Sequence, residues 1–471
     1  MDLTQLSASE IAAGVTAQKF SAVEVIEAHL ARIESVNPLV NAVVTVLPEA
    51  ARAAAAALDA RLEAGEPVGP LAGVPFTVKA NIDFAGQPTT WGVPALAEAV
   101  VPLDAPVVER MRAADAIPIG RTNLPDMALR LHTDSSLHGL TRNPWNLDRT
   151  AGGSSGGDAV ALATGMCAIG LGNDIGGSLR NPANACGIAS IRPSRGRVPD
   201  AGLVPREDPL LCWQLMNVQG PMARTVADVR AALAVLAGSH PRDPFALDMP
   251  LTAPTPDRRR VAVVPEPPGG DTDPVVAAAV RSAADWLSDA GYAVDEVTPP
   301  YYEEAVHTWA QFIITDLASI LPDLRAVMGA DGLRFLEPVV EAVGTLDAAG
   351  LSAVFVERHR IARAWAGFLA EHQVVLSPTW SQLPFEHGFD SDTPDGAMAA
   401  MELLRPVTPA NLLGLPSACV PAARDAATGL PIGVLLTGAR YTESLCLDAA
   451  AAIETRTPVR TPIEPVAPVG R

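Results

Sequence analysis

Two clusters of glycine and serine, separated by an apolar segment, constrain the fold of this chain more than any other stretch does. The first, Gly152 to Gly157, presents the adjacent hydroxyls of Ser154 and Ser155. The second, Asn173 to Ser178, ends in a serine that follows two glycines. Glycine adopts backbone conformations closed to other residues, so successive N–H groups in such a loop can turn inward and form a partly positive nest for an oxyanion. Residues Ala159 to Leu171 are typical of a helix leading into a buried strand, so we expect both loops at one end of a sheet.

A serine hydroxyl is a weak nucleophile and needs a base. The chain has 34 lysines and arginines, and only Lys19 and Lys79 among them are lysine. An ammonium can lose its proton inside a protein, whereas a guanidinium cannot. Lys79 ends an apolar, strand-like run, from which a strand can deliver its side chain to the rim of a sheet. We therefore take Lys79 as the candidate base and Ser178 as the candidate nucleophile, with a surface lysine that escaped the arginine bias as the alternative.

Three segments together resemble the motifs of the amidase signature family, whose catalytic set is Ser-cisSer-Lys. They are Gly73-Val-Pro-Phe-Thr-Val-Lys79, Gly152-Gly-Ser-Ser-Gly-Gly157 and Asp174-Ile-Gly-Gly-Ser-Leu-Arg180. The spacing between Ser178 and the first serine of the pair matches the family's if Ser154, and not Ser155, is the bridging serine, the one that passes a proton between the nucleophile and the lysine. The resemblance covers nearly the whole chain and is weakest across residues 240–370.

The resemblance implies an amidohydrolase that cleaves small acyl amides, with esters, anilides and carbamates as further candidates, through an acyl-enzyme on Ser178. In that scheme neutral Lys79 takes a proton from Ser154, which takes one from Ser178. The resemblance also implies that the Gly153–Ser154 peptide bond is cis. Burial must depress the pKa of Lys79 far below its ordinary value for this relay to run near neutrality. The developing oxyanion is held by the N–H groups of Ile175, Gly176, Gly177 and Ser178.

Other polar residues of the motifs have supporting roles in this interpretation. Asp174 and Arg180 are expected to pair with each other and fix their loop. Ser155 lies beside the bridging serine, and its removal is expected to matter less. Departures from the family's common residues bear on substrate range and occur at Asp158, Asn173 and Asn181.

The segment Arg130 to His138 contains His132 and His138, and the resemblance implies that it borders the substrate pocket. Because no third histidine or carboxylate stands at metal-binding spacing, we expect supporting or surface roles for both histidines. We predict no metal and no cofactor.

The composition limits the classes of partner that this protein is expected to bind. A formal net charge of −19 argues against nucleic acid and anionic membrane surfaces. Five scattered cysteines, odd in number, indicate free thiols in a reducing compartment. The N-terminus lacks the pattern of a signal peptide, and the longest uncharged apolar run is too short for a bilayer. We therefore expect a cytoplasmic protein. The resemblance implies that its partner is a small-molecule amide, and the sequence leaves a homodimer open.

Alternating helix-like and strand-like segments predict an α/β fold: a single large mixed, mostly parallel twisted β-sheet covered by helices on both faces. We expect one amidase signature domain over residues 1–471, with N-terminal helices in 1–65 that begin with two capping boxes. Residues 249–256, rich in proline, predict a surface connection. Residues 301–371 are mostly helical in pattern and concentrate aromatic side chains, which suit a core and a wall of the substrate pocket equally well.

Two other functions compete with a stand-alone amidase. One is a catalytic A-type subunit of a tRNA-dependent amidotransferase complex, and the other is a scaffold without enzymatic activity. The acidic balance and the divergent 300–400 region favour the stand-alone enzyme. A dinucleotide-binding site at Gly170 to Gly176 is disfavoured because Pro182 interrupts the helix that such a motif needs.

Overall fold

The computed structural model describes residues 1–254 and 259–466. The end of the predicted connection 249–256 and the end of the predicted domain 1–471 lie outside the described residues. At the centre is a mixed sheet with 11 strands among the described residues. In spatial order these are β1 (Val43–Val46), β3 (Ile117–Thr122), β2 (Pro75–Lys79), β6 (Ile169–Asp174), β8 (Val218–Ala223), β7 (Ala189–Arg192), β12 (Ser417–Arg424), β13 (Pro431–Gly438), β11 (Val374–Pro378), β9 (Arg260–Val263) and β10 (Ala293–Glu296).

The predicted α/β fold with a mixed sheet is confirmed, but the expectation of mostly parallel strands is wrong. Strand β2 runs parallel to β3 and β6, and β9 runs parallel to β10 and β11. Every described pair from β6 across to β11 is antiparallel, and so is the pair β1 and β3. The reason is visible at β12 and β13, which are joined by the short segment 425–430: without a crossover helix, consecutive strands must pair antiparallel.

Helices cover both faces of this sheet. Helix α16 packs on α8 and on α9, and all three pack on the sheet, whereas α5 and α6 pack on each other and on some of the same strands. The helices are α1 (Ala8–Thr16), α2 (Ala22–Val40), α3 (Pro48–Glu63), α4 (Pro106–Ala113), α5 (Gly156–Ala163), α6 (Arg180–Cys186), α7 (Leu211–Met216), α8 (Val226–Leu236), α9 (Pro274–Asp289), α10 (Tyr302–Ala318), α11 (Leu321–Val327), α12 (Ala330–Val343), α13 (Ala348–Glu371), α14 (Pro394–Glu402), α15 (Thr408–Leu413) and α16 (Glu443–Glu454). Short elements complete the described chain: the hairpin β4 (Asp134–Ser135) and β5 (Gly139–Leu140), and the 3-10 helices η1 (Leu3–Gln5), η2 (Pro94–Leu96) and η3 (Asp126–Ala128).

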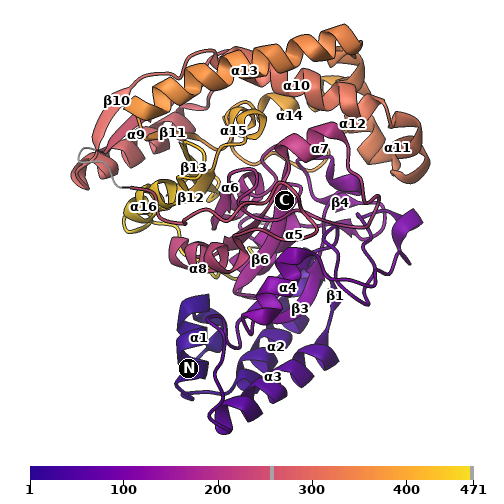
Figure 1. Cartoon of the computed structure of the whole chain (residues 1–471), viewed down its shortest axis with the longest axis vertical. Helices are drawn as coiled ribbons and strands as arrows, with labels where there is room; N and C mark the ends of the chain where they lie inside the picture. Colours follow the sequence, from indigo (N-terminus) through magenta and orange to yellow (C-terminus); the bar gives the residue numbers. More distant parts are fainter. Residues whose placement is uncertain (255–258, 467–471) are drawn as a thin grey trace.

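The N-terminal helices and the helices of residues 302–371 lie at opposite ends of the molecule (Figure 1). The two predicted capping boxes begin α1 and α2, where Ser7 pairs with Glu10 and Ser21 with Glu24. Helices α1 to α3 form one end, and the long α13 with α10 and α12 forms the other (Figure 1). The sheet and its two helix layers therefore occupy the middle of the molecule.

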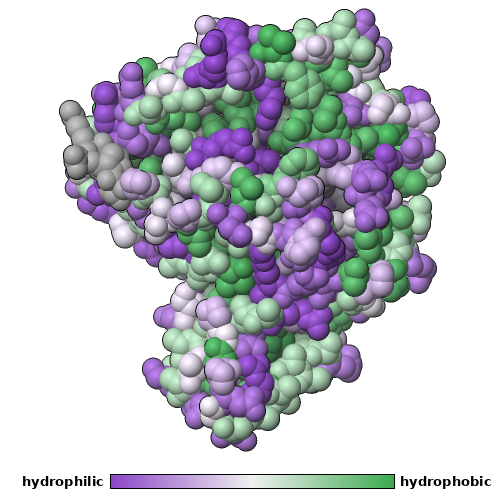
Figure 2. Space-filling model, in the orientation of Figure 1, coloured by the Kyte–Doolittle hydropathy of each residue, from purple (hydrophilic) through white to green (hydrophobic). Residues whose placement is uncertain are grey.

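Hydrophilic side chains spread over much of the face shown in Figure 2, in keeping with the strong negative charge. Within the part of the chain that the structure describes, no single helix is both long and apolar enough to cross a membrane, although the bent pair α12 and α13 passes by length and composition. The five cysteines are all buried and unbonded to one another.

Candidate active site

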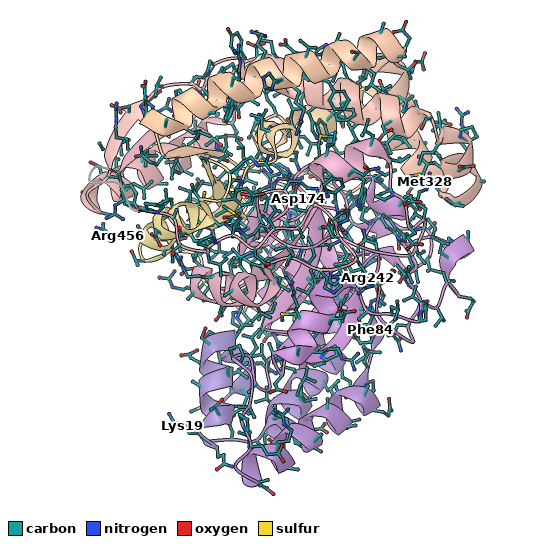
Figure 3. All side chains as sticks on the ribbon, viewed as in Figure 1. Lys19, Phe84, Asp174, Arg242, Met328 and Arg456 are labelled. Carbon is teal, nitrogen blue, oxygen red and sulfur yellow. The ribbon has the colours of Figure 1, made fainter. Side chains whose placement is uncertain are left out.

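Two neighbouring strands and two loops bring the candidate residues to one edge of the sheet. Lys79 is the last residue of β2, and Asp174 is the last residue of β6, its parallel neighbour. The loop 152–155 leads into α5, and the loop 175–179 joins β6 to α6. The backbone N–H of Ser155 donates to the carbonyl of Ser178 over 3.3 Å and ties the loops together. Asp174 lies near the middle of the molecule (Figure 3).

Lys79 is buried and contacts the bridging serine directly. Its Nζ donates to Ser154 Oγ over 2.7 Å and to Asn173 Oδ1 over 2.8 Å. Burial lowers the pKa of Lys79 to about 7, because the charged ammonium loses its hydration, and this effect outweighs the opposing attraction of Asp158 and Asp174. The alternative of a surface lysine is therefore wrong, and an uncharged amine is available near neutral pH.

The loop before α5 is shaped by glycines that admit no side chain. The peptide bond between Gly153 and Ser154 is cis, as the family resemblance implies. Gly152 has φ +76°, and a Cβ there would lie 2.6 Å from Pro182. A Cβ on Gly153 would lie 2.6 Å from the carbonyl oxygen of Arg130. The backbone of this loop is thus packed against its neighbours on both sides, which fixes where Ser154 presents its hydroxyl.

The predicted ion pair of the second loop is confirmed, and it is buried. Arg180 donates through Nε to Asp174 Oδ2 over 2.9 Å and through a terminal nitrogen to Oδ1 over 3.0 Å. Arg192 approaches the same carboxylate to 3.5 Å. Burial raises the pKa of Asp174, but the guanidiniums of Arg180 and then Arg192 outweigh it and hold this pKa below its usual range. Asp174 is therefore a permanent anion.

That anion also orients the predicted oxyanion loop. Asp174 Oδ1 accepts the N–H of Gly177 over 2.8 Å, so this N–H is already engaged. Among the described residues, the N–H groups of Ile175, Gly176 and Ser178 donate to no protein acceptor. These three remain the better oxyanion candidates.

Ser178 borders a small apolar cavity of about 60 Å³. A second cavity of about 670 Å³ adjoins it. Four residues line both cavities: Leu129, Ile175, Ile313 and Leu317. The rings of Trp91 and Trp213, with centroids 5.4 Å apart, lie on the wall of the larger one.

The aromatic side chains of α10 divide between the core and the pocket wall. Trp309 lines the small cavity, and its Nε1 donates to the carbonyl of Ile175 over 3.1 Å. Its ring also closes over Gly176, where a Cβ would lie 2.8 Å away. Phe312 is buried in the core, whereas Tyr301 is exposed. The pocket role of residues 301–371 thus applies to particular side chains and not to the aromatic group as a whole.

Asn173 is a residue whose importance the sequence did not reveal. It was identified only as a departure from the family's common residue, yet it accepts a hydrogen bond from Lys79 and donates through Nδ2 to Asn81 Oδ1 over 3.1 Å. Asp158, a second departure, is buried and accepts from Thr77 Oγ1 over 2.8 Å. Burial raises the pKa of Asp158 to about 7. The signal that would have singled out Asn173 is its place at the end of β6, beside the strand that carries Lys79.

The two histidines of the 130–138 segment differ in their surroundings. His132 is buried and bonded to other side chains, whereas His138 is partly buried, and its Nε2 has no hydrogen-bond partner among the described residues. No group of three or more potential metal ligands gathers anywhere in residues 1–254 and 259–466.

Comparison with known proteins identifies relatives of this chain. The family model described as Amidase matches residues 24–447. The chain is 44% identical over 461 residues to an indoleacetamide hydrolase of Bradyrhizobium diazoefficiens. The match covers 96% of this chain and 86% of that protein. It is 35% identical to the A-type subunit of the glutamyl-tRNA(Gln) amidotransferase of Acidothermus cellulolyticus, over 98% of this chain and 96% of that one. Among solved structures, a bacterial aryl acylamidase superposes with a TM-score of 0.82 at 30% identity, covering 96% of each chain. The chain belongs to the amidase signature family.

Proposed function

We propose that this protein is an amidohydrolase that cleaves small-molecule amides through an acyl-enzyme on Ser178. The observation that carries the proposal is the 2.7 Å contact between Lys79 Nζ and Ser154 Oγ at a buried site. There the pKa of Lys79 falls to about 7 through burial. A lysine with a pKa near neutrality, in contact with a serine hydroxyl, can act as a general base.

In the proposed relay, neutral Lys79 accepts the proton of Ser154, and Ser154 accepts the proton of Ser178 as its Oγ attacks the amide carbonyl. Asn173 Oδ1 accepts one amine hydrogen and so leaves the lone pair of Nζ free to face Ser154. The tetrahedral intermediate then collapses, the C–N bond breaks, and the amine leaves with the relayed proton. Water attacks the acyl-enzyme by the reverse relay and releases the carboxylic acid.

Backbone N–H groups of the loop after β6 stabilise the charge that develops on the carbonyl oxygen. Ile175, Gly176 and Ser178 supply donors that no protein acceptor occupies among the described residues. The loss of one such donor typically costs about 3–4 kcal/mol of transition-state stabilisation. The buried Asp174 and Arg180 pair holds this loop in position.

The proposed substrates are amides with an apolar or aromatic acyl group. The cavity beside Ser178 has an apolar lining, and the adjoining cavity of about 670 Å³ falls within the range of small-molecule sites. Trp91 and Trp213 offer aromatic surface there. The name of the 44% identical indoleacetamide hydrolase makes arylacetamides the first class to test.

The test is a purified chain assayed with indole-3-acetamide, phenylacetamide, an acyl anilide and the matching ethyl esters. We expect release of the carboxylic acid from at least one amide, and mass spectrometry of the quenched reaction should find the acyl group on Ser178. Ser178→Ala should abolish both signals while circular dichroism and melting stay close to wild type. Undiminished turnover in Ser178→Ala would refute the assignment of the nucleophile.

The 35% identity to an A-type amidotransferase subunit over nearly the whole chain supports one alternative, a catalytic subunit that delivers ammonia to a partner's product. Such a subunit should be nearly inactive toward small amides on its own and should release ammonia from glutamine when its partners are added. Turnover of arylacetamides by the isolated chain, without activation by amidotransferase partner subunits, supports the stand-alone enzyme.

A further inference from the structure

A chain of hydrogen bonds runs from a partly exposed histidine to the loop that carries the bridging serine. His387 Nε2 contacts the carbonyl oxygen of Leu147 at 2.9 Å, and His387 Nδ1 contacts His132 Nε2 at 3.3 Å. His132 Nδ1 contacts Thr150 Oγ1 at 3.0 Å, and Thr150 Oγ1 accepts the N–H of Gly152 over 3.1 Å. The two imidazole planes are nearly parallel, 16° apart. Gly152 is two residues from Ser154.

The chemistry of the end groups fixes the direction of this chain. A carbonyl oxygen only accepts, so Nε2 of His387 carries a hydrogen and Nδ1 of the neutral ring is an acceptor. His132 must then donate from Nε2, which makes its own Nδ1 an acceptor for the Thr150 hydroxyl. Burial, followed by the nearby Arg130 charge, lowers the pKa of His132 well below its ordinary value, so this ring is neutral. Each link has one donor and one acceptor only while both rings are neutral.

The segment that carries His132 also holds the catalytic loop directly. Thr133 Oγ1 donates to the carbonyl of Gly152 over 2.8 Å and accepts the N–H of Gly156 over 3.1 Å. The backbone of residues 130–132 lies so close to Gly153 that a Cβ there would be 2.6 Å from it. The loop of His387 is tied to the same region, because Thr150 N donates to the carbonyl of Phe385 over 2.9 Å.

From this geometry we infer that His132 and His387 form a positioning pair that holds the 152–154 loop in its catalytic conformation only while both imidazoles are neutral. The inference rests on the proposed function, since it concerns the relay through Ser154. Neither imidazole is among the residues that line the two cavities, so the pair acts through Thr150 and Gly152 and not on the substrate.

A proton added to the pair removes this match of donors and acceptors. A proton on Nδ1 of His387 sets it against the N–H of His132 across 3.3 Å. If His132 changes tautomer instead, Thr150 Oγ1 must accept from both His132 and Gly152, and its own hydrogen loses the acceptor it had. Either arrangement loosens the hold on the loop that carries Ser154, so activity should fall with acidification beyond the loss due to Lys79 alone.

Several charged groups lie around the pair, and four of them form two ion pairs. Arg130 donates to Asp390 in a buried ion pair, with a closest contact of 2.8 Å, and Arg149 lies 3.2 Å from Glu386 on the more exposed side. Asp392 approaches Gly388, the neighbour of His387. None of these groups is part of the hydrogen-bond chain.

The decisive experiment compares pH profiles of kcat and KM for wild type and His387→Asn from pH 4.5 to 8.5. The Asn side-chain oxygen can stand near the position of Nδ1 and accept from His132 at every pH, so this variant keeps the acceptor and has no ring nitrogen there to take up a proton. In wild type, log kcat should fall with a slope approaching two on the acid side, since two protonations act together. In His387→Asn the slope should stay near one. On the acid side, the ratio of its kcat to that of the wild type should therefore grow about tenfold for each unit by which the pH falls. KM should change little.

The matched control is His359→Asn, which removes an exposed histidine on α13 and should leave the two-proton slope intact. His132→Asn keeps an acceptor for Thr150 without reaching His387 and should also give a slope near one. If it fails to fold, the His387→Asn profile decides alone. Equal acid slopes in wild type and His387→Asn would overturn the inference. A wild type that turns over no amide would instead refute the proposed function.

Discussion

At the scale of single residues, the candidate site contains a buried amine whose charged form is disfavoured. Lys79 is enclosed by β2, β6 and the loop before α5, and its Nζ contacts Ser154 and Asn173. The cost of burying an ammonium lowers its pKa to about 7. An arginine in the same place would stay charged at any accessible pH, so the retention of lysine in an arginine-rich chain has a direct chemical reason.

Replacing this base should remove the relay without removing the fold. We expect Lys79→Arg to lower kcat/KM by about 10²–10⁴-fold, the usual contribution of a positioned general base. The measurement is initial-rate kinetics on the best arylacetamide, with the melting temperature as a check on folding. Lys19→Arg changes an exposed lysine and is the matched control, which should keep full activity. Full activity in Lys79→Arg would exclude this residue as the base.

The two adjacent serines should respond differently to the loss of their hydroxyls. Ser154 Oγ accepts from Lys79, whereas Ser155 Oγ has no hydrogen-bond partner among the described residues. We expect Ser154→Ala to lower kcat by about 10²-fold or more and Ser155→Ala to change it by less than about tenfold. Steady-state kinetics and the rate of labelling by a sulfonyl fluoride measure both effects. The reverse order would assign the bridging role to Ser155.

The pH dependence follows from the direction of the lysine shift. Burial lowers the pKa of Lys79 from about 10.5 to about 7, so the active, neutral amine accumulates as the pH rises through 7. Through Lys79 alone, kcat/KM should rise about tenfold per unit below pH 7 and level off above it. We expect this one-base profile in His387→Asn and a steeper acid limb in the wild type, where the imidazole pair adds its own dependence. A rise that continued to pH 10 would mean that the base titrates like a free lysine.

The sequence indicated residues that the structure brings together, Lys79 with Ser154 and Asp174 with Arg180, and it did not indicate the side chains that support them. Lys79, Ser154 and Asp174 each stand in a motif, and the ion pair with Arg180 could be inferred from spacing on one loop. Asn173 could not be assigned a role, because its contact depends on which strand lies beside β6. That neighbour is β2, which is distant in sequence.

At the scale of elements, the loop between β6 and α6 is held by one anion. Asp174 accepts the N–H groups of Gly177 and Leu179 as well as the guanidinium of Arg180. It thereby joins the end of a strand to the beginning of a helix and sets the direction of the N–H groups between them. Helix, strand and loop are positioned together.

Removing the cation of this pair should be costly. We expect Arg180→Met to lower the free energy of unfolding by about 3–5 kcal/mol, because it leaves the buried carboxylate of Asp174 with less compensation. Chemical denaturation with urea measures the change. Arg325→Met removes a partner from an exposed ion pair with Glu337 and should change stability little. Equal effects of the two substitutions would contradict the structural role of the buried pair.

Element types were more predictable than strand partners. Helical periodicity and capping boxes at Ser7 and Ser21 indicated α1 and α2 correctly, because both signals are local. The antiparallel half of the sheet was missed, because alternation of helix-like and strand-like segments is also the pattern of a parallel sheet. Direction depends on how each connection returns. The short segment 425–430 indicates the antiparallel pair β12 and β13, whereas the longer connections before β8 do not show in the sequence how the chain returns.

At the scale of the whole molecule, one carboxylate joins the first helix to the helix layer on the sheet, in addition to the apolar packing of the N-terminal helices. Asp228, in the first turn of α8, accepts from the N–H groups of Ala8 and Ser9 and from the Ser9 hydroxyl at 2.7–3.0 Å. These residues are about 220 positions apart in sequence. One carboxylate therefore caps α1 and also anchors it to the layer of helices on the sheet.

Loss of that carboxylate should loosen one end of the molecule and spare the site. We expect Asp228→Ala to cost about 1–3 kcal/mol and to speed hydrogen exchange in α1, because two backbone donors lose a buried acceptor. Hydrogen exchange read by mass spectrometry localises the effect. Asp448→Ala, which breaks a half-exposed pair with Arg230, is the control and should leave α1 protected. Unchanged exchange in α1 of Asp228→Ala would show that other contacts hold this helix.

The distribution of primary amines has a practical consequence. Lys79 is enclosed, so the lysine that remains reactive is the exposed Lys19, at the end formed by α1 to α3 (Figures 1 and 3). Succinimide esters or an aldehyde-coated support should therefore attach the protein by this end alone. Immobilised in this way, every copy would present the same face to the flowing solution, with its catalytic centre remote from the attachment point.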